Sequence, residues 1–235
     1  MKGTLVLVGA GEFLETMNEV DRVLLERAGG LRVVVLPTAS APDGPGVPER
    51  WANMGVEHFN RLGARAEAVM ALDRAACADE ALAEKVQTAN LVYFSGGKPD
   101  YLYETLVDTP IWQAVKHVLN RGGVVAGCSA GAIILGGYVP RFSMVLGLPW
   151  VSQWSPAFGL VPDAIVAPHY NEFPEFLVDV ILNRRPAGSF LIGVDAHTAL
   201  IGSNGDWHVI GAGRVTLRRR RQVRRFTQGQ SVSLP

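Results

Sequence analysis

Apolar runs alternate with amphipathic segments over the first half of the chain. Short, mostly apolar runs predict strands at residues 4–8, 32–36, 66–70, 91–94 and from 124 onward. Between these runs, apolar residues recur at helical spacing, which predicts the following helices: 15–28, 49–62, 79–88, 101–107 and 110–120. Strands without a polar face need cover on both sides, so the pattern predicts an α/β fold, a three-layer αβα sandwich around a mostly parallel, doubly wound sheet.

The second half of the chain has a less regular pattern. Residues 138–159 combine aromatic residues with prolines, and we interpret them as a long loop that either walls a pocket or packs on the sheet edge. Further patterns predict a strand at 164–167, a helix at 172–182 and a strand at 190–194. The turn sequence at 204–206 lies between alternating segments, which predicts an antiparallel C-terminal edge on the sheet. The sequence contains no internal repeat and no stretch with the composition of a linker, so we expect one domain over residues 1–235.

Composition narrows the classes of function. The 235 residues are 48% hydrophobic and 19% charged, with a formal net charge of zero. Nucleic-acid and membrane-surface binders depend on excess positive charge, so the expected partner is a small molecule or a peptide. The N-terminal apolar run suits a first strand better than a signal peptide, and no run reaches the ~20 apolar residues of a membrane span. We expect a cytoplasmic monomer or homodimer.

The two cysteines, Cys77 and Cys128, are too few for a disulfide framework and lack metal-ligand spacing. We therefore expect a reducing compartment, no metal and no cofactor. An arginine cluster at 218–225 lacks interleaved aromatic residues, and we interpret it as charge that protects an edge strand from pairing.

The stretch at 122–137, GGVVAGCSAGAIILGG, carries the clearest chemistry. It predicts a strand, a sharp G-x-S-x-G turn and a short helix, the context in which the central serine is lifted clear of its neighbours. Ser129 is then a nucleophile, and the N–H of Ala130 supplies half of an oxyanion hole. The alternative is a glycine-rich turn that only packs closely.

Other strand ends supply partners for this serine, because the carboxyl ends of parallel strands lie at one edge of a sheet. The turn Ser95-Gly96-Gly97 is the best source of a second oxyanion donor, at Gly97, since glycine lets its N–H approach a substrate. As an alternative, it is an ordinary tight turn.

A serine nucleophile needs a base, and five histidines are available. His169 directly follows a predicted strand, whereas His197 is a reserve candidate. Asp163 begins the same strand, about 20 Å away at ~3.3 Å per residue, which makes it a poor third member. Glu172 and Asp195 remain as candidates for the acid.

Seven segments, in this order and spacing, resemble one family over nearly the whole chain: LVGAGE, LPTAS, YFSGG, GCSAGA, GLVPDAIVAPHY, IGVDAHTAL and WHVIGAGRVTL. They are similar to the serine peptidases that include peptidase E, an aspartyl dipeptidase, and cyanophycinase, whose fold is like that of class I glutamine amidotransferases. The resemblance implies a nucleophile at Ser129, a histidine at His169, and an oxyanion hole from the Gly96-Gly97 turn and the amide after the serine.

The chain also departs from that family. Members carry an acid between the serine and the histidine, but residues 136–148 contain none. Pro99 stands where cyanophycinase has a glutamine, and Asp195 is followed by alanine rather than glutamate. The acid and the substrate are therefore open.

The expected function is a serine hydrolase that cleaves a small peptide or amide. One alternative is a catalytically weakened family member that binds a peptide or metabolite in the same cleft. Another is an esterase of the α/β-hydrolase type, although its early oxyanion loop and late histidine are not evident in the sequence.

Overall fold

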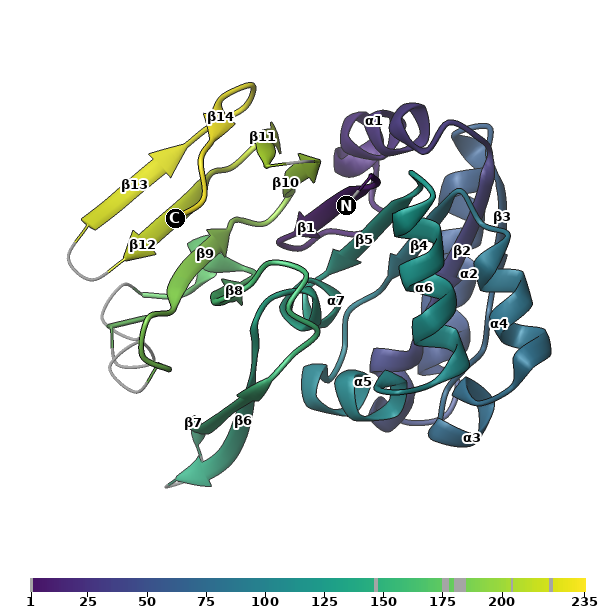
Figure 1. The fold of residues 1–235 in the computed structure, drawn as a ribbon, viewed down its shortest axis with the longest axis horizontal. Coiled ribbons are helices and arrows are strands. Elements are labelled where there is room, and N and C mark those ends of the chain that lie inside the picture. The colour runs from purple at the N-terminus through teal and green to yellow at the C-terminus, as the bar shows by residue number, and fades with distance from the viewer. Residues whose placement is uncertain (1, 146–147, 175–177, 180–184, 204, 220–221) are drawn as a thin grey trace.

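The computed structural model describes residues 2–145, 148–174, 178–179, 185–203, 205–219 and 222–235. Within these ranges the largest sheet has eight strands (Figure 1). Their spatial order is β14 (Ser231–Val232), β11 (Asp206–Gly211), β10 (Thr198–Ser203), β1 (Thr4–Val8), β5 (Val124–Cys128), β4 (Leu91–Phe94), β2 (Arg32–Leu36) and β3 (Arg65–Ala68).

Strands β1, β5, β4, β2 and β3 are parallel to one another, whereas β10, β11 and β14 continue the sheet beyond β1 in antiparallel fashion. The prediction of a mostly parallel sheet with an antiparallel C-terminal edge is confirmed. Strand β3 begins and ends earlier than the predicted 66–70.

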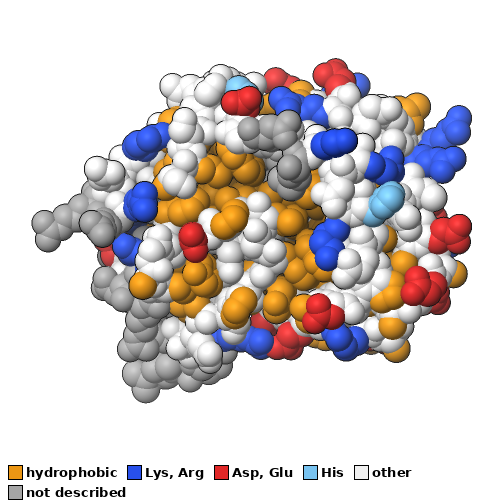
Figure 2. Space-filling view, viewed as in Figure 1, with side chains coloured by type: hydrophobic (Ala, Val, Ile, Leu, Met, Phe, Trp, Pro, Cys, Tyr) orange, Lys and Arg blue, Asp and Glu red, His pale blue; other side chains and the backbone are white. Residues whose placement is uncertain are grey.

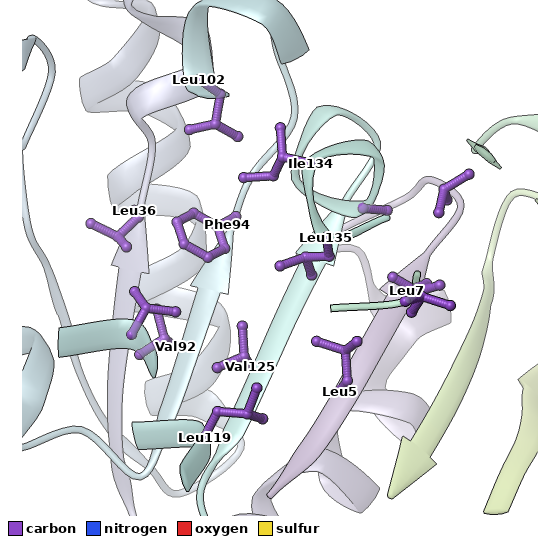
Figure 3. Close-up of a cluster of buried hydrophobic side chains, with 14 of the residues drawn as sticks. Leu5, Leu7, Leu36, Val92, Phe94, Leu102, Leu119, Val125, Ile134 and Leu135 are labelled. Carbon is purple, nitrogen blue, oxygen red and sulfur yellow. The ribbon is translucent and has the colours of Figure 1, made fainter. Parts of the chain in front are cut away.

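Successive residues of the central strands face opposite layers. In β1, Leu5 and Leu7 belong to one buried cluster, whereas Val6 and Val8 belong to another. The first cluster includes side chains of helices α4 (Glu80–Gln87), α5 (Pro99–Leu106), α6 (Pro110–Asn120) and α7 (Ala130–Leu135), and Figure 3 shows part of it. The second includes side chains of α1 (Asn18–Ala28) and α2 (Val47–Arg61). The sheet is thus covered on both faces, as its apolar strands require.

Shorter helical segments connect these elements. They are η1 (Glu15–Met17), η2 (Thr38–Asp43), α3 (Arg74–Cys77) and η3 (Tyr170–Glu172). The segment between β2 and α2 contains the 3-10 turn η2, and α3 was not predicted from the sequence. The predicted helix at 172–182 falls largely outside the described residues; Glu172 ends the 3-10 turn η3.

The prediction of a long loop at 138–159 is wrong. Most of this segment forms an antiparallel hairpin of β6 (Tyr138–Val145) and β7 (Leu148–Pro156), which projects from the molecule (Figure 1). Pro140 lies opposite Trp154, and Pro156 opposite Tyr138. A two-stranded ribbon tolerates prolines because each strand has a free edge on which the missing N–H is not needed.

A second sheet contains four described strands, in the order β13 (Gln222–Phe226), β12 (Val215–Arg219), β9 (Phe190–Val194) and β8 (Ala164–Ala167). Strands β8 and β9 are parallel to each other, and β13, at the edge, carries exposed Arg224 as the sequence suggested. A single parallel β-bridge between Ala10 and Ala196 holds the turn after β1 against the turn after β9. Figure 2 shows hydrophobic side chains gathered in the middle of one face, over the junction of the two sheets.

Candidate active site

The chain passes from β5 to α7 at Ser129, which has φ 52° and ψ −111°. A non-glycine residue seldom adopts a positive φ, and such strain at a strand-to-helix turn exposes the side chain. A Cβ on Gly127 would lie 2.3 Å from the backbone of Gly131, and a Cβ on Gly131 would lie 2.7 Å from that of Phe94. Close packing therefore explains both glycines of the G-x-S-x-G sequence.

The imidazole of His169 bridges the serine and a carboxylate. Its Nε2 lies 3.2 Å from Oγ of Ser129, and its Nδ1 lies 3.2 Å from Oε2 of Glu172. His169 follows β8 with a left-handed backbone, φ 53° and ψ 30°, which turns the chain into η3. The side chain of Glu172 is 55% exposed and that of His169 34%, so the serine–histidine contact is the more sheltered of the two.

The turn after β4 and the start of α7 lie next to the serine. A Cβ built on Gly96 would lie 3.7 Å from Oγ of Ser129, so the turn after β4 packs against this side chain. Gly97 has φ 144°, and a Cβ there would lie 2.2 Å from the carbonyl oxygen of Ala39, so only glycine fits. The N–H of Ala130 is the first of α7 and has no intrahelical acceptor.

Sequence reasoning missed Glu12, whose side chain is buried behind the serine turn. Its Oε1 accepts a hydrogen bond from the N–H of Gly96 at 2.9 Å, and its Oε2 accepts one from Sγ of Cys128 at 2.9 Å. Burial and the nearby Glu12 carboxylate raise the pKa of the Cys128 thiol well above its usual value. The buried thiol remains protonated, so Cys128 is not an activated nucleophile.

One cavity of about 230 Å³ brings together four of the residues singled out by the sequence. These are Ser129, His169, Gly97 and Ala130. They come from the ends of β5, β8 and β4 and from the start of α7, so the expected convergence of strand ends holds across two sheets.

The other candidates lie elsewhere. Oδ2 of Asp195 accepts a hydrogen bond from the N–H of Arg214, and desolvation raises its pKa. The Nδ1 of His197 lies 2.9 Å from Oγ1 of Thr16. Asp163 precedes β8, at the end of that strand remote from His169. The structure therefore brings Glu172, and not Asp195, to the histidine.

The remaining three histidines do not line the cavity that contains Ser129. His58 is fully buried in α2, with Nε2 2.8 Å from Oδ2 of Asp21. His117 belongs to α6, and His208 contacts Ser231 in the C-terminal strands.

Among the described residues, no three His, Cys, Asp or Glu side chains are grouped so that they could hold a metal ion. Over these same residues, no helix has the length and apolar character needed to cross a membrane.

Comparisons with known proteins agree on one family. The model of peptidase family S51 matches residues 5–210. A crystal structure of a peptidase from an acI-B1 Actinobacterium superposes with a TM-score of 0.89 at 34% identity, covering 100% of this chain and 98% of that one. Cyanophycinases from Synechococcus elongatus and Trichormus variabilis are each 25% identical over 233 residues, covering 92% of this chain and 68% and 73% of theirs.

Proposed function

Because the chain belongs to peptidase family S51, we propose that it is a serine peptidase that cleaves a small peptide or amide through Ser129. The observation that carries this proposal is the 3.2 Å contact between Oγ of Ser129 and Nε2 of His169 at a strained strand-to-helix turn. That distance suits proton transfer from hydroxyl to imidazole once a substrate has bound.

In the proposed reaction, the hydroxyl oxygen attacks the scissile carbonyl while His169 takes its proton. The tetrahedral intermediate carries its negative charge beside the N–H groups of Gly97 and Ala130. His169 then gives the proton to the leaving amine, and water hydrolyses the acyl-enzyme by the same steps. Each oxyanion donor contributes roughly 3–4 kcal/mol of transition-state stabilisation in enzymes of this kind.

Glu172 is the proposed third member. As a carboxylate 3.2 Å from Nδ1, it accepts the hydrogen bond that fixes the tautomer of His169 with Nε2 free to act as base. The acid thus follows the histidine in the sequence, which accounts for the absence of an acidic residue from 136–148.

The exposure of Glu172 favours one alternative function. Water competes for a carboxylate that is 55% exposed, so its interaction with the imidazole is weakened. A family member with weak activation of its serine would bind a peptide or metabolite in the same cavity and turn it over slowly.

A single domain and a cytoplasmic setting are further parts of the proposal. One buried hydrophobic cluster includes residues of both large sheets, which supports a single domain over residues 1–235. Both cysteines are free and buried, which suits a reducing cytoplasm.

A fluorophosphonate probe tests the activated serine. We expect labelling of the purified protein that is lost in Ser129→Ala and strongly slowed in His169→Ala. The matched control is His208→Ala, which removes a histidine from the C-terminal strands and should label like the parent. Labelling that persists in Ser129→Ala, or none in the parent, would count against the peptidase and in favour of the binding function.

A further inference from the structure

The cavity beside Ser129 is apolar beyond the reacting groups. Its walls come from α7, the β6–β7 hairpin, β8 and β9, and its lining includes the following side chains: Ile133, Val151, Trp154, Val166, Tyr170 and Leu191. Within the part of the chain that the structure describes, no Asp, Glu, Lys or Arg lines it. Pro99 adds another apolar surface without a side-chain donor.

Two arginines on elements next to the cavity are engaged with other groups. Arg218 donates to the hydroxyl of Tyr170 at 3.4 Å and forms an ion pair with Asp179. Arg141, on the hairpin, pairs with Glu104. Because no Lys or Arg is among the described lining residues, an acidic substrate side chain in this cavity would lose its hydration without gaining an ion-pair partner from the lining, which is unfavourable.

The size of the cavity limits what it holds. At about 230 Å³ it is smaller than the ~300–1,000 Å³ of pockets that enclose drug-sized ligands. One amino-acid side chain next to the scissile bond suits this volume, and burial of an apolar side chain is favoured in proportion to the apolar area removed from water.

We infer that this peptidase selects an uncharged, apolar side chain, such as that of leucine, at a position flanking the scissile bond. This inference rests on the proposed function for the location of the scissile bond, but the cavity binds an apolar side chain whether or not Ser129 is activated.

Binding to Ser129→Ala tests the inference without turnover. Isothermal titration calorimetry measures the binding of two matched series of free dipeptides to Ser129→Ala. The first series is Leu-Ala, Asp-Ala and Lys-Ala, and the second is Ala-Leu, Ala-Asp and Ala-Lys. In at least one series, the leucine dipeptide should bind about 10-fold or more tightly than its charged counterparts, as apolar pockets discriminate. Binding of an aspartate or lysine dipeptide as tight as or tighter than that of the leucine dipeptide in both series, or no binding of either leucine dipeptide, would overturn the inference.

A charge in the cavity wall provides a second test. Ile133 lines the cavity one turn after Ser129, so Ile133→Lys should lower the leucine-to-aspartate affinity ratio at least 10-fold in the Ser129→Ala background. Ile133→Met keeps the wall apolar and should keep the ratio within about 2-fold. Because each ratio is measured within one protein, a general loss of stability cancels. An unchanged ratio in Ile133→Lys would contradict the assignment of this cavity.

The two proposals can fail separately. Absence of fluorophosphonate labelling with preferential binding of leucine dipeptides would reject the peptidase and keep the apolar site. Labelling with preferential binding of aspartate dipeptides would keep the peptidase and reject the apolar site.

Discussion

Oε2 of Glu172 lies 3.2 Å from Nδ1 of His169, three residues earlier in the sequence. The 3-10 turn Tyr170–Glu172 brings them together, because residues three apart lie on the same side of such a turn. A local turn thus supplies the acceptor for the histidine, in a position where water also reaches the carboxylate.

Replacement of Glu172 by glutamine should lower kcat/KM about 10- to 100-fold, below the ~10⁴-fold loss for a buried triad aspartate, because the exposed carboxylate contributes less. Steady-state kinetics on a cleaved peptide measures this loss. The control is Asp195→Asn, which alters the other candidate acid and should change kcat/KM less than 3-fold. A larger loss in Asp195→Asn than in Glu172→Gln would reverse the assignment.

Glu12 should act as a positioning residue for the oxyanion turn. Its carboxylate holds the N–H of Gly96 at 2.9 Å, directly before Gly97. In Glu12→Ala that N–H loses its acceptor and the turn loosens, so kcat should fall with little change in KM, by up to the ~10²–10³-fold that loss of an oxyanion donor costs. Glu12→Gln keeps an oxygen acceptor for Gly96.

The comparison of these two variants tests the role. We expect kcat of Glu12→Gln to be at least 5-fold above that of Glu12→Ala, with thermal unfolding measured to compare stability. If both variants lose activity equally while their unfolding temperatures differ, the carboxylate contributes to stability and not to the turn.

Local patterns predicted the large sheet well, for a physical reason. Strand β1 is apolar on both faces because Leu5 and Val6 enter different buried clusters, and such strands occur in sheets covered on both sides. The second sheet could not be predicted, since β12 pairs with β9 only after the chain has passed through β10 and β11 of the first sheet. Nothing in the local pattern of β9 identifies that partner.

The candidate site likewise combines features that local sequence predicts with contacts between residues far apart in the chain. Ser129 and Gly97 were predicted as site residues because their proposed roles follow from local turn geometry. Glu12 was missed because its two partners, Gly96 and Cys128, lie 84 and 116 residues away. Its position directly after the first strand, at the same sheet edge as the other candidates, was the available signal.

The buried pair of His58 and Asp21 should contribute to stability rather than activity. Both side chains are fully buried, and their contact joins α2 to α1 at 2.8 Å. Asp21→Ala leaves the imidazole without its partner, which typically costs about 3–5 kcal/mol. Urea denaturation measures this change in the free energy of unfolding.

Glu19→Ala on the same helix provides the control, since Glu19 is exposed and accepts a hydrogen bond from Gln228 at the surface. It should cost less than about 1 kcal/mol. A loss below 1 kcal/mol in Asp21→Ala would mean that the pair barely offsets its own desolvation.

The thiol of Cys77 should make the protein less stable at alkaline pH. Burial, the largest cause, raises its pKa from 9.0 to about 11, so between these values the unfolded chain releases the proton before the folded chain does. The folded state then binds more protons than the unfolded state, and the free energy of unfolding falls as pH rises. A shift of two pKa units corresponds to about 3 kcal/mol in the free energy of unfolding. This stabilisation is fully present below pH 9 and is lost by about pH 11.

Urea denaturation of the parent and of Cys77→Ala between pH 8 and 11 isolates this contribution. Tyr93 and Cys128, whose pKa values burial also raises, destabilise both proteins in the same direction and cancel in the difference. The cavity left by the missing sulfur adds an offset that does not depend on pH. We expect the stability advantage of the parent over Cys77→Ala to shrink by roughly 2–3 kcal/mol across this range. Parallel curves for the two proteins would show that the thiol ionises equally readily in the folded and unfolded states.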